Sequence, residues 1–105
     1  MNLEQLLKDA DDAANAKARE MERQLGRDWG LCGFAWIVVE DGRSPIVREM
    51  KRLGIGSKNH GKGWMVWGPG NSRFQNVDVH AEAARAYAGV LQKAGIVAHA
   101  CSRLD

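Results

Sequence analysis

Apolar residues recur every three or four positions over the first 25 residues, which predicts a long amphipathic helix. The stripe consists of Leu3, Leu7, Ala10, Ala14, Ala18, Met21 and Leu25. Asn2 followed by Gln5 is typical of a capping box, and Gly26 supplies an end. Because the stripe is rich in alanine, we expect this helix to approach its neighbour closely. Two neighbours would satisfy it: the sheet of the same chain, or the same helix of a second copy, which would form a homodimer.

The remainder of the chain alternates between short apolar runs and helical periodicity. Four runs predict strands: 31–40, 64–67, 72–77 and 96–101. Ser44 and Pro45 start a helix that ends at Gly54, and Asp78 starts another that ends at Gly95. The order β-α-β-β-α-β predicts an α+β fold with a ferredoxin-like antiparallel sheet and both helices on one face. A chain of 105 residues has room for one core, so the helix over 1–26 and the region 31–105 should form one domain.

Strand alternation divides the predicted sheet into two faces. Small and branched residues suit the helix-covered face, and the other face then carries Phe34, Trp36, His99 and both cysteines. The N-terminal helix would either cover this second face, making Phe34 and Trp36 core residues, or leave it open. The pattern favours the covered arrangement.

The charges are unevenly distributed along the chain. The first 30 residues carry seven acids and five bases. The region 43–73 carries one acid, Glu49, and seven bases: Arg43, Arg48, Lys51, Arg52, Lys58, Lys62 and Arg73. Such asymmetry is typical of a surface for an anionic partner, and also of a solvated face.

The glycine-rich stretch "GSKNHGKG" (56–63) is one residue short of a phosphate-binding P-loop. A P-loop needs a serine or threonine after the lysine and a helix behind it. Gly63 takes the place of that hydroxyl, and a strand-like segment follows, so the stretch is not a P-loop. Its glycines and lysines suit either anion binding through backbone N–H groups or a simple basic connection.

Aromatic residues next to lysines suit single-stranded nucleic acid, because bases stack on rings and phosphates pair with cations. Alternation places Trp64 and Trp67 on opposite faces. "KGWMVW" (62–67) departs from the signature of RNA-recognition modules after two residues, and the predicted third strand offers only Phe74. The predicted binding residues are Lys58, His60, Lys62, Trp64, Trp67 and Arg73.

Cys32, His99 and Cys101 fall near one another in the predicted sheet. They lack a Cys-x-x-Cys pair and a fourth ligand for zinc, and no acid is evident to orient a Cys–His pair. We therefore interpret the cysteines as structural thiols and predict no metal, no cofactor and no enzymatic activity. The sequence shows no signal-peptide core and no transmembrane run, which predicts a cytoplasmic protein without a membrane partner.

Residues 33–105 resemble small accessory proteins of tailed bacteriophages, a group without an established activity. The similarity is carried by "GFAW" (33–36), "GIG" (54–56), "GW" (63–64), Trp67 with its turn, "AYAGVLQKAGI" (86–96), and Ser102, Arg103 and Asp105. It implies a protein of the bacterial host cytoplasm that binds and modulates a host protein or nucleoprotein complex, with inhibition of a host defence system as one form. Two alternatives remain: a single-stranded nucleic-acid-binding module of RNA-recognition-like topology, and a protein that sequesters a nucleotide signal.

Overall fold

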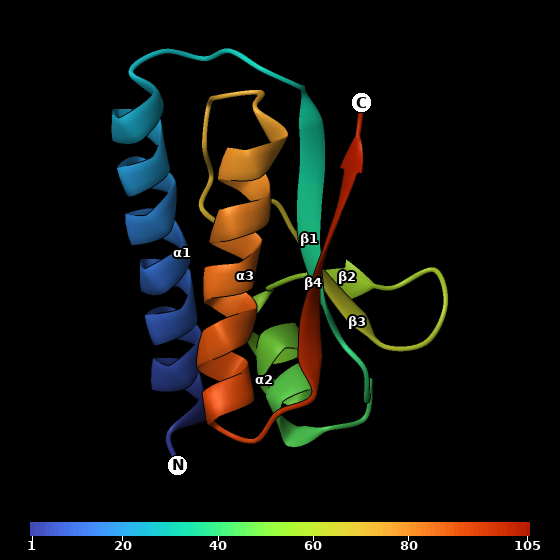
Figure 1. Ribbon diagram of the computed structural model, residues 1–105. Helices are drawn as coiled ribbons and strands as arrows, with labels where there is room; N and C mark the ends of the chain where they lie inside the picture. The colour runs from blue at the N-terminus through green and yellow to red at the C-terminus, as the bar shows by residue number, and fades with distance from the viewer.

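The computed structural model, which describes residues 1–105, contains three helices and one four-stranded antiparallel sheet, as expected for an α+β fold (Figure 1). The helices are α1 (Leu3–Leu25), α2 (Pro45–Leu53) and α3 (Val77–Lys93). The strands are β1 (Gly33–Val39), β2 (Ser57–Lys58), β3 (Trp64–Trp67) and β4 (Ala98–Leu104). They lie in the order β2-β3-β1-β4, so β1 and β3 are the central strands. None of the helices has the length and apolar run that a bilayer crossing requires.

The N-terminal helix begins and ends where the sequence predicts. The side chain of Asn2 accepts a hydrogen bond from the backbone N–H of Gln5 at 3.0 Å. Ala10, Ala14 and Ala18 are fully buried, and α1 lies alongside α3 (Figure 1). The alanine stripe therefore packs on a helix of the same chain and not on the sheet.

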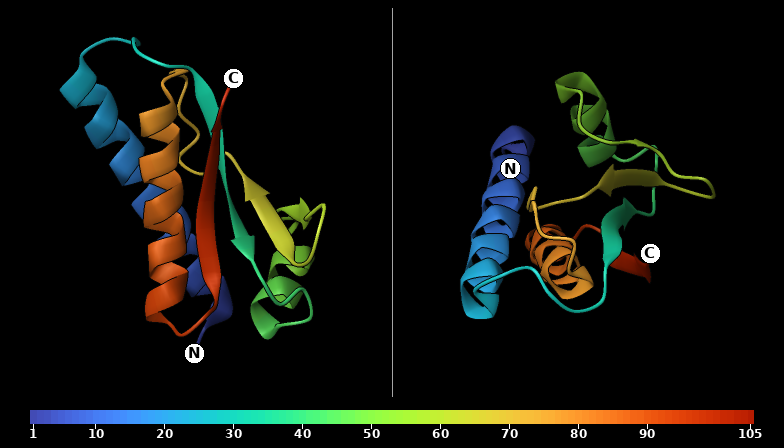
Figure 2. Two further views of the ribbon diagram at one scale, coloured as in Figure 1. Left: turned by 45° about the vertical axis from the view of Figure 1, so that its right-hand side comes forward. Right: turned by 90° about the horizontal axis from the view of Figure 1, so that it is seen from above.

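The helices and one face of the sheet share a single core. Ala35, Ile37 and Val39 of β1 are buried there, together with residues of α2 and α3 such as Met50 and Leu91. Figure 2 shows α1 on the far side of α3 from the sheet.

The interpretation that α1 covers the second face of the sheet is wrong. Since α1 packs on α3, that second face has no helix over it (Figure 2). Phe34 is 37% exposed and Trp36 is half-buried. These aromatic side chains therefore lie at a surface and are not part of the helix-covered core.

The predicted strand at 72–77 is also wrong, because side chains take the backbone groups that a strand would use. Asp28 accepts hydrogen bonds from the N–H groups of Gln75 and Asn76 at 2.8 and 3.2 Å. The side chain of Asn76 then caps α3 by accepting from the N–H groups of Asp78 and Val79. Asn76, and not Asp78, is therefore the N-cap of α3. The fourth strand of the sheet is not at 72–77 but is the two-residue β2, inside the glycine-rich stretch.

The last strand starts two residues later than predicted and runs to the end of the chain. Residues after α3 remain attached to its C-terminal turn, where the N–H of Ile96 donates to the carbonyl of Leu91 at 3.1 Å. β4 therefore begins at Ala98 and continues through Leu104. This extension brings Arg103 into the sheet.

Tyr87, the single tyrosine of the chain, is 2% exposed in α3. Burial, with a smaller contribution from the negative charge of Asp11, raises the pKa of its hydroxyl to about 12. The hydroxyl of a tyrosine in the unfolded chain has a pKa of about 10. Because the unfolded state then loses its proton first, the folding stability should fall as the pH rises from about 10 to about 12. We expect ultraviolet absorbance to report tyrosinate formation near pH 12 in the folded chain and near 10 in urea. Asp11→Asn should lower the pH midpoint of tyrosinate formation in the folded chain. Equal midpoints in buffer and in urea would contradict the burial of Tyr87.

Candidate functional site

The antiparallel register of β1 with its neighbours places four large side chains on the open face of the sheet. Trp36 lies opposite Trp67 of β3, and Phe34 lies opposite Arg103 of β4. Residues directly opposite each other in an antiparallel pair point to the same side. We call the three aromatic residues, Phe34, Trp36 and Trp67, the aromatic platform.

The rings of the aromatic platform contact one another. Trp36 and Trp67 are stacked, with ring centroids 5.3 Å apart and planes at 12°. Phe34 is tilted by 35° against Trp67, with centroids 5.8 Å apart. Trp67 remains 50% exposed. Large apolar side chains that gather at a surface indicate a binding site more often than chance, because leaving them in water costs free energy.

Arg103 supplies a positive charge on the aromatic platform itself. Its guanidinium carbon lies 5.6 Å from the ring centre of Phe34 and 5.9 Å from that of Trp67. A guanidinium over aromatic rings gains about 0.5–1 kcal/mol at an exposed site. That energy is small enough for Arg103 to leave the rings when a ligand offers a stronger anionic partner.

The end of β2 and the loop that joins it to β3 carry three of the predicted binding residues: Lys58, His60 and Lys62. All three are exposed. Figures 1 and 2 show this loop extending away from α1 and α3. Its base is ordered, because Asn59 donates through its side chain to the carbonyl of Lys62 at 2.9 Å. Gly63 packs against the carbonyl of Val39 so closely that a Cβ would collide with it. The loop therefore holds its cations beside the end of β1.

Trp64 and Trp67 lie on opposite faces, as predicted, and this separates their roles. Trp64 is half-buried on the helix side, and its indole N–H donates to the carbonyl of Ile55 at 2.9 Å. The ammonium of Lys51 lies 5.0 Å above its ring. Trp64 therefore serves to hold α2 and the following loop, and Trp67 alone of the two reaches the open face.

Arg73 lies apart from the other predicted binding residues. Its neighbour Ser72 contacts Glu22 near the C-terminal end of α1, and Gln75 bonds to Gly33 at the start of β1. The basic loop lies instead at the other end of β1. The structure thus brings Trp67 to the open face and keeps Lys58, His60 and Lys62 exposed near the loop end of β1. Lys58 lies opposite Trp64 and therefore shares the helix side with it, and Arg73 lies near the other end of β1.

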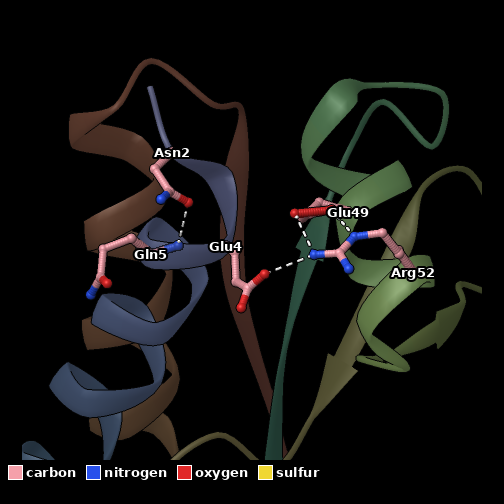
Figure 3. A network of polar contacts seen from close by, with 5 residues as sticks. All are labelled: Asn2, Glu4, Gln5, Glu49 and Arg52. Atoms are coloured by element: carbon pink, nitrogen blue, oxygen red, sulfur yellow. Dashed lines mark hydrogen bonds and ion pairs between the residues drawn. The ribbon is translucent and has the colours of Figure 1, made fainter.

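Part of the positive charge in the basic region 43–73 is neutralised by ion pairs, and part of it is not. Arg52 of α2 donates to Glu4 of α1 at 2.8 Å and to Glu49 at 2.6 Å (Figure 3). These bonds raise the pKa of Arg52, and the hydrogen bond from Arg52 lowers the pKa of Glu49. Glu4 of α1 and Glu49 of α2 therefore offset the charge of Arg52, whereas Lys58 and Lys62 remain exposed.

The two cysteines do not form a joint site with His99. Both thiols are free. Cys32 precedes β1 and its carbonyl accepts from the N–H of Asp105, whereas Cys101 lies opposite Trp36 in the middle of the sheet. His99 lies opposite Val38 and 3.7 Å from Glu40. The three residues are thus spread along β4, and they are not gathered around one point.

Sequence reasoning missed Arg103 because it ended the last strand at residue 101. Alternation continued for two more residues would have placed Arg103 on the same face as His99 and Cys101.

Comparison with protein-family models, curated proteins and solved structures finds no match. The open face offers aromatic stacking surfaces with a guanidinium among them, and exposed lysines lie near the loop end of β1.

Proposed function

We propose that the protein binds single-stranded nucleic acid on the open face of its sheet. The observation that carries this proposal is the aromatic platform, three contacting rings on the two central strands with Arg103 over them. Exposed aromatic side chains stack on bases of any sequence, and cations pair with the phosphates between them. The protein acts by binding and carries out no chemistry.

Each part of the surface takes a role that follows from its position. Trp67 and Phe34, the more exposed rings, stack on bases, and Trp36 supports Trp67 from the neighbouring strand. Arg103 exchanges its ring contacts for a phosphate. Lys62, exposed in the β2–β3 loop, attracts the strand to that end of the platform.

We also propose the finer fold class predicted from the sequence, a ferredoxin-like sheet used in the manner of RNA-recognition modules. The succession β-α-β-β-α-β after α1 and the antiparallel pairing of all neighbouring strands support it. "KGWMVW" (62–67) lies on β3 of the structure, so aromatic residues occur on both central strands. The departure of this stretch from the recognition signature favours binding with little sequence preference.

A second candidate function uses the same face for a host protein or nucleoprotein complex. Tryptophan and arginine dominate the energetics of protein interfaces, and Trp67 and Arg103 lie together at the surface. A phage accessory protein that modulates host machinery, including a defence system, would bind through this patch. Sequestration of a nucleotide signal by the β2–β3 loop is a third candidate function, and an experiment must distinguish it from the other two.

Fluorescence anisotropy of a labelled 12-nucleotide single strand, titrated at several salt concentrations, tests the main proposal. If Arg103 and Lys62 each neutralise one phosphate, a plot of the logarithm of the affinity against the logarithm of the salt concentration should have a slope of about −1.4. Lys62→Gln should make the slope shallower by about 0.7. Arg73→Gln removes the same charge away from the open face and should leave the slope unchanged.

The remaining outcomes decide between the candidates. Absence of binding at every salt concentration overturns the nucleic-acid proposal and makes capture of a protein partner from host lysate the next experiment. Binding of a mononucleotide as tight as that of the 12-mer would favour sequestration of a small nucleotide, because stacking on several rings requires several bases.

A further inference from the structure

A cleft of about 560 Å³ lies on the helix side of the molecule, and the functions above use only Trp67 among its lining residues. Its walls are the N-terminal half of α1, residues 53 and 55 at the end of α2, residues 66–71 after the middle of β3, and Tyr87 of α3. Clefts of this size are typical of sites for small molecules.

The cleft exists because α1 is held by its neighbours at separate places. Near its N-terminus, Glu4 is tied to Arg52 of α2 (Figure 3). Further along, Arg19 donates to the carbonyl of Gly70 in the turn after β3 at 3.1 Å. Between these contacts α1 follows α3 and leaves α2 and β3 partly uncovered.

The interior of the cleft is apolar. Leu7 of α1, Leu53, Ile55 and Val66 line it, and Leu7 is fully buried in the core. Such surfaces gain about 25 cal/mol for each Å² of apolar ligand area that they remove from water. A flat hydrocarbon or aromatic group is the kind of ligand that this lining favours.

One buried polar group reaches this apolar interior. Tyr87 is among the most buried residues of α3, lines the cleft, and makes no hydrogen bond to another group of the chain through its hydroxyl. No side-chain oxygen that is sealed from solvent lacks a partner, so this hydroxyl keeps its small exposed area toward the cleft that it lines. A ligand in the cleft can therefore bond to it in place of water.

The charge around this hydroxyl is negative. Glu4 is neutralised by Arg52, and Lys8 is paired with Asp12 at 3.3 Å. Asp11 lines the cleft and contacts only the neutral amide of Asn15, at 3.3 Å. Asp11 is therefore the carboxylate of the cleft that remains without a cationic partner. It lies on the α1 wall of the cleft, near Tyr87 of α3.

We propose that the cleft binds a small, flat apolar molecule that carries a protonated amine. The apolar body lies on Leu53, Ile55 and Val66, and the ammonium donates to the carboxylate of Asp11 and to the hydroxyl oxygen of Tyr87. Molecules of the same shape that carry a carboxylate are rejected by Asp11. The proposal does not rest on nucleic-acid binding at the open face, although Trp67 borders both surfaces.

Three probes of matched shape test the charge preference: tryptamine, its alcohol tryptophol, and indole-3-propionate. Calorimetric titration of the full chain should show one tryptamine per chain, binding about tenfold more tightly than tryptophol, since charge-assisted hydrogen bonds are the stronger ones. Indole-3-propionate should show no saturable binding. Equal affinity for the three probes, or no binding of tryptamine at millimolar concentration, overturns the proposal.

Two variants assign the preference to this cleft. Asp11→Asn should remove the tenfold advantage of tryptamine over tryptophol while leaving tryptophol binding unchanged. Asp9→Asn changes the same charge on α1 outside the cleft, where Asp9 bonds to Gln5, and should leave the advantage intact. An advantage that survives Asp11→Asn, or that Asp9→Asn also removes, would contradict the assignment.

Discussion

Replacing Trp67 by alanine is expected to weaken binding of the 12-nucleotide strand by about 10- to 100-fold and to leave the fold intact. Stacking of one base on an aromatic side chain contributes about 1–3 kcal/mol, and each 1.4 kcal/mol corresponds to a factor of ten. Trp67 also lies within 5.3 Å of Trp36 and 5.8 Å of Phe34, so its loss leaves both neighbours without their contact partner. Anisotropy titration at fixed low salt measures the change.

The matched control is Trp29→Ala. Trp29 is 57% exposed, like Trp67, but it precedes β1 and lies outside the sheet. We expect its replacement to leave the affinity within a factor of two. Equal losses for the two variants would mean that tryptophan removal weakens the protein in a general way. Wild-type affinity of Trp67→Ala would remove the aromatic platform from the binding surface.

The sequence predicts the helices well because their signals are local. Asn2 and Gly26 mark the ends of α1, and Ser44, Pro45 and Gly54 mark those of α2, as the structure confirms. Local sequence also identifies β1, whose apolar run is long and β-branched.

The arrangement of α1 depends on contacts that the sequence does not specify. Alanines at positions 10, 14 and 18 indicate that something packs closely, but the same stripe suits a sheet, a second copy or a helix. In the structure α3 presents Ala83 near Ala18, with Gly70 between the two helices. This mutual fit of small residues favours packing of α1 on α3, which leaves the aromatic platform open.

The candidate site could be predicted only in part, again because some of its geometry depends on contacts between distant parts of the chain. Exposed lysines near residue 60 and Trp67 follow from composition and alternation. The stacking of Trp36 on Trp67 depends on the register between β1 and β3, which no local pattern gives. That register is set beside the loop, where Gly63 approaches the carbonyl of Val39.

The contact between α1, α3 and the turn after β3 should make Gly70 sensitive to substitution. Gly70 is buried with φ +90°, and a Cβ there would lie 2.6 Å from the Cβ of Ala83 and 3.0 Å from that of Ala18. Gly70→Ala therefore adds an overpacked methyl group, about 1–3 kcal/mol, to a left-handed backbone that costs ~1–2 kcal/mol for alanine. We expect the free energy of unfolding to fall by about 3 kcal/mol in urea titrations followed by circular dichroism.

A second glycine separates the two contributions. Gly54 ends α2 with φ +73°, and a Cβ there would meet nothing within 4 Å. Gly54→Ala should therefore lose only the conformational part, about 1 kcal/mol. The difference between the two variants measures how tightly the turn is packed between α1 and α3. If both glycines cost the same, the turn does not fix α1 on α3, and the open face of the sheet must be kept free by other contacts.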